Sequence, residues 1–105
     1  MAQFDVYTNP NPDSRASVPF VVDVQSGLID SLPTRLVVPL SRTGAGFTRL
    51  PTNLCPVLEV AGESLSLMPH LAAPVAARQL RKPLFSIQHR ASDISAAMDA
   101  VLSGF

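Results

Sequence analysis

The side chains of this chain that suit nucleophilic or metal chemistry are few and widely spaced. Its 105 residues include one cysteine, Cys55, and two histidines, His70 and His89. This set is too small for the cysteine and histidine clusters that hold structural zinc. A nucleophilic Cys–His pair requires Cys55 to lie beside a histidine in space. The positions of these residues in the sequence do not decide whether it does. The simpler interpretation is that Cys55 is a small buried apolar residue, and we expect no catalytic residue, metal or cofactor.

Three further motifs contain residues that could do chemistry, and each also has a structural explanation. Asp23 and Asp30 flank the stretch QSGLI with no third acid nearby, so neither a metal site nor an acid–base pair is predicted. The stretch GAGF at Gly44–Phe47 lacks the spacing of a phosphate-binding loop and is interpreted as a flexible turn. His89 and Arg90 precede the last predicted helix, where they either open the helix or bind an anion.

The most closely spaced basic residues are Arg78, Arg81 and Lys82. One interpretation is a solvated loop. The other is a docking site for an acidic segment of a partner, because guanidinium and ammonium groups bind carboxylates well. The sequence leaves both interpretations open.

The charge balance excludes several classes of function. Eight basic and eight acidic residues give a formal net charge of zero, so direct sequence-specific binding of nucleic acid is not expected. No apolar run approaches the roughly 20 residues that span a membrane. The start, MAQFDVYTNP, lacks the basic and apolar regions of a secretory signal. With a single cysteine and hence no intrachain disulfide, these features predict a cytoplasmic protein.

The hydrophobic pattern predicts one domain, spanning residues 1–105, made of short strands. Ten prolines exclude long helices before Pro83, and 47% hydrophobic with 15% charged residues indicates a compact core or an apolar surface for another subunit. Alternating or β-branched runs predict the strands. The region 69–80 contains helix formers interrupted by Pro74, and it is predicted as strand and loop. The predicted strands are Gln3–Thr8, Phe20–Val24, Arg35–Leu40, Leu54–Val60 and Leu65–Met68, the last two forming a hairpin around AGES.

One amphipathic helix is predicted at about residues 92–103. Ser92 is the expected N-cap, and Asp93 follows it at the positive end of the helix dipole. Gly104 lies where helices commonly end. Apolar residues recur at three- and four-residue spacing at Ile94, Ala97, Met98, Val101, Leu102 and Phe105.

The stretch VDVQSGLID at Val22–Asp30, followed by RLVVPL at Arg35–Leu40, resembles the CcdB family of plasmid and chromosomal toxins. The resemblance covers almost the whole chain and is least certain over residues 9–19 and 41–53. Further matches in the same order are QFDVYTN at the start, LCPVLEVAGES at Leu54–Ser64, His89-Arg90, Asp93-Ile94, Ala97 and the penultimate Gly104.

The resemblance implies a mainly β fold, an SH3-like antiparallel β-barrel with a small extra sheet and a C-terminal α-helix. It also implies a homodimeric, non-enzymatic toxin of a type II toxin–antitoxin system. Such toxins bind the A subunit of DNA gyrase and trap its complex with cleaved DNA. A CcdA-like antitoxin neutralises them through a disordered tail that folds on the toxin, as segments that cover a large surface often do.

The resemblance also implies which residues contact gyrase. Well-studied members end in Trp-Gly-Ile, which contacts gyrase, and this chain departs from them with Ser103 in place of the tryptophan. It also carries Asp99 where those members carry asparagine. The gyrase-binding residues implied are Leu28, Ile29, Asp99, Ser103, Gly104 and Phe105. The candidate antitoxin-binding site is proposed from charge alone and not from the resemblance, and it consists of the closely spaced Arg78, Arg81 and Lys82.

Two alternatives to a gyrase poison remain at this stage. The MazF and Kid toxins share this barrel but cut messenger RNA, and fold alone does not decide function. Cleavage of RNA calls for a basic groove with acid–base residues, which a neutral chain with scattered arginines does not suggest. The other alternative is a degenerate homologue that binds antitoxin but no longer poisons gyrase, for which Ser103 is the main argument.

Overall fold

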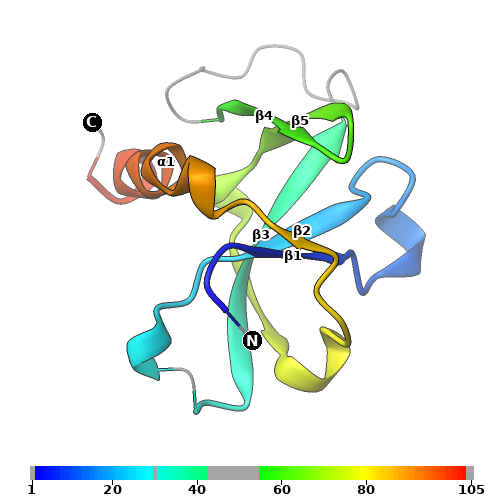
Figure 1. Cartoon of the computed structure of the whole chain (residues 1–105), viewed down its shortest axis with the longest axis vertical. Coiled ribbons are helices and arrows are strands. Elements are labelled where there is room, and N and C mark those ends of the chain that lie inside the picture. The colour runs from blue at the N-terminus through cyan, green and yellow to red at the C-terminus, as the bar shows by residue number, and fades with distance from the viewer. Residues whose placement is uncertain (1, 30, 43–54, 104–105) are drawn as a thin grey trace.

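The structure is a computed structural model that describes residues 2–29, 31–42 and 55–103. Its strands form one curled antiparallel sheet in the order β4-β5-β3-β2-β1-β7, and the extra strand β6 pairs with β3. One α-helix, α1, lies against this half-barrel (Figure 1). The strands are β1 (Asp5–Thr8), β2 (Phe20–Asp23), β3 (Thr34–Arg42), β4 (Val57–Val60), β5 (Glu63–Leu67), β6 (Ala73–Ala76) and β7 (Phe85–Ser86). The prediction of a mainly β fold with a C-terminal helix is confirmed.

The long strand β3 organises the sheet. One of its edges pairs with β2, while the opposite edge pairs with β6 over Thr34–Val37 and with β5 over Leu40–Arg42. Pro39 lies between these two paired segments, at a point where a missing backbone donor interrupts neither ladder. The division of one edge between two partner strands lets the sheet curl. Where a small extra sheet was predicted, the structure has one extra strand, β6, which pairs with β3.

Apolar side chains cover both faces of β1, β2 and β3. Val6, Val22 and Val38 belong to the main core, together with residues of the β4–β5 hairpin and α1. The intervening residues Tyr7 and Val21 lie on the opposite face, in a second buried cluster that also contains Val37 and Leu80. Because successive side chains of a strand point to opposite faces, two cores follow from one alternating pattern.

The β4–β5 hairpin was predicted from its turn residues. Ala61 and Gly62 both have positive φ, +53° and +78°, as a two-residue hairpin turn of this kind requires. The short strand β7 was not predicted. It pairs with β1, and the Phe85 ring packs edge-on against Phe20 at a centroid distance of 6.0 Å.

Helix α1 (Ala91–Ser103) buries Ile94, Ala97 and Ala100. The prediction that Ser92 is its N-cap is wrong, because a 3₁₀ turn at Gln88–Arg90 leads directly into the helix. Ala91, the first residue of α1, already has helical angles of −55° and −41°, so Ser92 lies inside the helix. Gly104, the predicted helix terminator, lies outside the described residues.

Candidate functional site

Among the described residues, Leu28 is the most exposed large apolar side chain. It lies in the 3₁₀ turn η2 (Gly27–Ile29), between β2 and β3, and its relative exposure is 96%. The Ser26 hydroxyl accepts a hydrogen bond from the Leu28 backbone N–H at 3.1 Å, which fixes the start of the turn. Ile29 belongs to the same turn. A leucine held almost fully in solvent is suited to burial against a partner.

A buried polar network anchors the segment that carries Leu28. Arg35 Nε donates to Asp23 Oδ2 at 2.7 Å, and both side chains are at most 1% exposed. The other carboxylate oxygen of Asp23 accepts from the Gln25 N–H at 2.9 Å. The Gln25 side-chain oxygen in turn accepts from the Leu36 N–H at 3.0 Å. These bonds tie the end of β2 to β3, so η2 projects from a well-fixed base.

Asp99 and Ser103, the helix residues for which the resemblance implies a gyrase contact, are both exposed on neighbouring turns of α1. The Ser103 hydroxyl donates to the Asp99 carbonyl at 2.6 Å, so this side chain is bonded back onto its own helix. Leu102 beside them is 81% exposed. The last two implied residues, Gly104 and Phe105, lie outside the described residues.

A groove of about 190 Å³ separates α1 from the strands next to η2. Asp99 and Met98 line it from the helix, and Val24 lines it from the end of β2, close to the start of η2. Figure 1 shows η2, in cyan, on the same side of the molecule as the C-terminal half of α1. The fold therefore brings Leu28 and Asp99 to one side, although they come from distant parts of the sequence.

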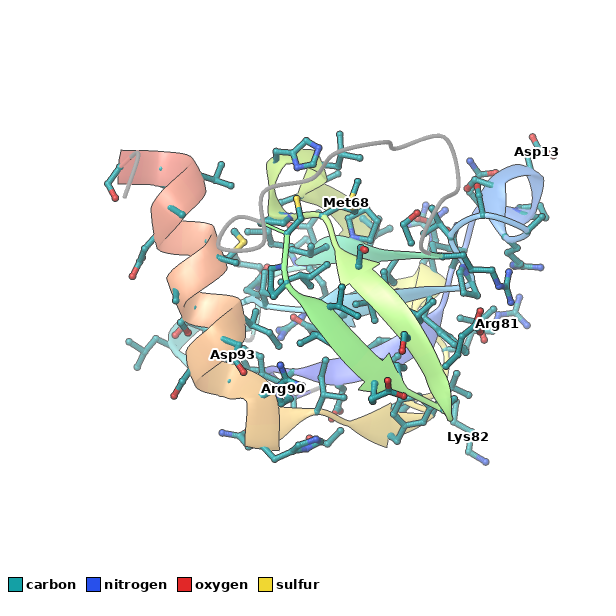
Figure 2. The ribbon with its side chains drawn as sticks, turned by 90° about the horizontal axis from the view of Figure 1, so that it is seen from above. Asp13, Met68, Arg81, Lys82, Arg90 and Asp93 are labelled. Carbon is teal, nitrogen blue, oxygen red and sulfur yellow. The ribbon has the colours of Figure 1, made fainter. Side chains whose placement is uncertain are left out.

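The basic residues Arg78, Arg81 and Lys82 line a second, larger cleft of about 660 Å³. Arg15 completes it from the loop after β1, which the sequence analysis did not foresee. Figure 2 shows Arg81 and Lys82 on the side of the molecule opposite α1. The two groups of implied contact residues thus occupy separate surfaces.

Comparison with known proteins places the whole of this architecture in one family. The chain matches the CcdB protein family over residues 3–104. It belongs to the CcdB family. CcdB toxins are non-enzymatic gyrase poisons of toxin–antitoxin systems, so the site sought in this CcdB protein is a contact surface and not a catalytic centre.

Among the residues that the structure describes, Cys55 and His70 resemble a catalytic pair, but they lack an activated nucleophile. Cys55 Sγ lies 3.8 Å from His70 Nδ1, so the structure brings together the two residues that the spacing left open. Burial raises the pKa of the Cys55 thiol by desolvation, which disfavours the thiolate that a nucleophile needs. The prediction that Cys55 is buried is confirmed, since the residue is 3% exposed.

Two other findings concern the part of this CcdB protein that the structure describes. In residues 2–29, 31–42 and 55–103, no three side chains of histidine, cysteine, aspartate or glutamate come together to hold a metal ion. Within the same residues, no helix has the length and apolar character needed to cross a membrane.

Proposed function

We propose that this CcdB protein is a toxin that binds the A subunit of DNA gyrase and stabilises the gyrase complex with cleaved DNA. A CcdA-like antitoxin would neutralise it, and both would act in the cytoplasm, where gyrase works. The observation that carries the proposal is the 96% exposed Leu28 on an anchored turn, at a position where the resemblance implies a gyrase contact.

The proposed gyrase surface joins η2 with the exposed face of α1. Burial of a fully exposed leucine side chain is worth about 1.5–3 kcal/mol, so Leu28 alone is a substantial anchor. The buried network behind it reduces the conformational entropy lost on binding. The proposed contact residues are Leu28, Ile29, Asp99, Ser103, Gly104 and Phe105.

Ser103 gives this chain a smaller contact than the tryptophan of other members. Because its hydroxyl already bonds to the Asp99 carbonyl, a partner can cover Ser103 without leaving that hydroxyl unsatisfied. We propose that Phe105 restores part of the apolar contact area that tryptophan supplies elsewhere.

We also propose that the protein is a homodimer. Leu102 on α1 and Leu71 on the 3₁₀ turn η3 (Pro69–Leu71) are 81% and 46% exposed, and the two elements contact one another. Apolar side chains exposed on adjoining elements are typical of a subunit interface. Sedimentation of the purified protein measures this directly.

The test of the function is a DNA cleavage assay. Purified protein is incubated with supercoiled plasmid, ATP and gyrase, and the products are treated with detergent and protease. We expect linear DNA that requires both proteins. A variant without Gly104 and Phe105 is expected to form no linear DNA while keeping the same unfolding midpoint.

The alternatives give different results in parallel reactions. Sequence-specific fragments from labelled single-stranded RNA would indicate a ribonuclease of the MazF and Kid type. A folded dimer that yields neither linear DNA nor RNA fragments would indicate a homologue that has kept the scaffold and lost this target. Either result would contradict the proposal.

A further inference from the structure

The larger cleft described above has an unusual charge distribution. The structure describes seven arginine and lysine residues, and three of them, Arg35, Arg42 and Arg90, each have a carboxylate oxygen at 2.7 Å. No described carboxylate pairs with the remaining four. Those four are Arg15, Arg78, Arg81 and Lys82, and all of them line the same cleft.

This concentration of unpaired charge is built by two separate segments. Arg78 lies in the 3₁₀ turn η4 (Ala77–Gln79), and Arg81 and Lys82 follow it closely. Arg15 comes from the loop after β1, where its Nε donates to the Asn9 carbonyl at 2.6 Å and is thereby held at the cleft. Like charges gathered in a concave surface repel one another unless an anion binds between them.

The cleft also has apolar walls. Tyr7, Pro10 and Leu84 line it between the charged residues. Leu84 is 47% exposed, and its backbone N–H donates to the Val6 carbonyl at 2.8 Å, which holds it beside β1. A ligand that fills this cleft gains most if it carries both negative charges and an apolar group.

An acidic peptide fits this pattern better than a nucleic acid does. A duplex presents a long row of phosphates, and this chain has no net charge to attract one. Asp13 is exposed on the same side of the molecule as Arg81 and Lys82 (Figure 2), and it would repel a polyanion that extended past the cleft. A short segment with carboxylates around one apolar side chain avoids that repulsion.

We propose that this cleft binds an acidic segment of the antitoxin, with carboxylates against the four cations and an apolar side chain against Pro10 and Leu84. The identity of this partner rests on the proposed function. The chemistry of the cleft does not, because it follows from the unpaired cations and the apolar walls alone. Occupation of the cleft would leave the gyrase surface at η2 and α1 uncovered by this segment.

The test is fluorescence anisotropy with defined peptides at low salt. The probe is a fluorescein-labelled peptide of sequence Glu-Glu-Leu-Glu-Glu-Leu-Glu-Glu. The matched peptide has glutamine in place of every glutamate and keeps both leucines. Tripolyphosphate and a thymidine oligonucleotide of the same length are the phosphate competitors. The full chain is used throughout, with variants Arg78→Gln, Arg81→Gln and Lys82→Gln in the cleft.

The control variant is Arg90→Gln, which changes the net charge equally but lies at the start of α1, away from Arg81 and Lys82 (Figure 2). We expect each cleft variant to weaken binding of the glutamate peptide by about fivefold, since exposed ion pairs contribute up to about 1 kcal/mol. The affinity of Arg90→Gln should equal that of the unaltered protein, and added salt should weaken binding.

Several results would overturn the inference. The cations would have no role if the glutamate peptide did not bind, or if the glutamine peptide bound equally well. The same conclusion would follow if Arg90→Gln weakened peptide binding as much as the cleft variants do. Tighter binding of tripolyphosphate or the oligonucleotide would make the cleft a phosphate site. The Arg81→Gln variant is also assayed for gyrase-dependent DNA cleavage, which should be unchanged. Peptide binding without cleavage would refute the gyrase target alone, and cleavage without peptide binding would refute the cleft alone.

Discussion

Replacement of Asp23 by asparagine is expected to lower the free energy of unfolding by about 3–5 kcal/mol, because it removes the negative charge of a buried ion pair. Arg35 and Asp23 are 1% and 0% exposed, so water cannot replace the lost carboxylate. With a urea m-value of about 1.5 kcal/mol/M, a loss of this size moves the unfolding midpoint down by about 2–3 M. Urea titration followed by far-UV circular dichroism measures this shift.

The chain contains a matched control for this experiment. Arg42 and Glu63 form an ion pair with the same N–O distance, 2.7 Å, but their side chains are 43% and 40% exposed. Glu63→Gln should therefore cost less than about 1 kcal/mol. Equal midpoint shifts in Asp23→Asn and Glu63→Gln would refute the argument from burial. If Asp23→Asn does not fold, the double variant Asp23→Leu with Arg35→Met removes both charges and should fold.

Three further predictions concern stability and the thiol. Ile94→Ala should cost about 2–5 kcal/mol by urea titration, because Ile94 is 1% exposed in the core under α1, whereas Ser95→Ala at an exposed residue of the same helix should cost less than about 0.5 kcal/mol. Gly62→Ala should cost about 1–2 kcal/mol in the same assay, because a residue with a side chain is strained at the φ of +78° that Gly62 adopts. Crowding would not contribute, since no atom outside the neighbouring residues lies within 4 Å of the added Cβ. A midpoint shift no larger than that of Gly27→Ala would contradict this prediction. Ellman's reagent should react slowly with Cys55 in the native protein and rapidly in urea, because burial raises the pKa of the thiol and shields it. Burial of the neutral thiol also makes stability depend on pH: this contribution is complete below the ordinary thiol pKa and is lost as pH rises through the raised pKa. A fast reaction of the native protein with the reagent near neutral pH would contradict the burial of Cys55.

Much of the fold was predictable because its elements have strong local patterns. The alternation in Gln3–Thr8 and the β-branched run at Phe20–Val24 predicted β1 and β2, and helical spacing predicted α1. Strand β7 was not predicted because a strand of two residues is too short to show an alternating hydrophobic pattern. Its position is set by its pairing with β1. The start of α1 was misjudged because the 3₁₀ turn before it has no sequence pattern of its own.

The candidate site was less predictable because its parts are joined by tertiary structure. The cluster of Arg78, Arg81 and Lys82 is visible in the sequence, but Arg15 joins it only through the packing of the loop after β1. The buried pair of Asp23 with Arg35 depends on the register of β2 against β3. A signal was present, since an acidic residue ended an otherwise apolar strand and an arginine began the next one.

The most direct test of the central claim is calorimetric titration of the gyrase A subunit with this protein and its Leu28→Ala variant. We predict that the unaltered protein binds and that Leu28→Ala weakens binding by about 10- to 100-fold, the equivalent of about 1.5–3 kcal/mol. Its unfolding midpoint should stay the same, because Leu28 is 96% exposed. Val57→Ala, at a 48% exposed residue of β4, is the control and should bind normally. Absence of binding by the unaltered protein, or equal affinities of Leu28→Ala and Val57→Ala, would contradict the account.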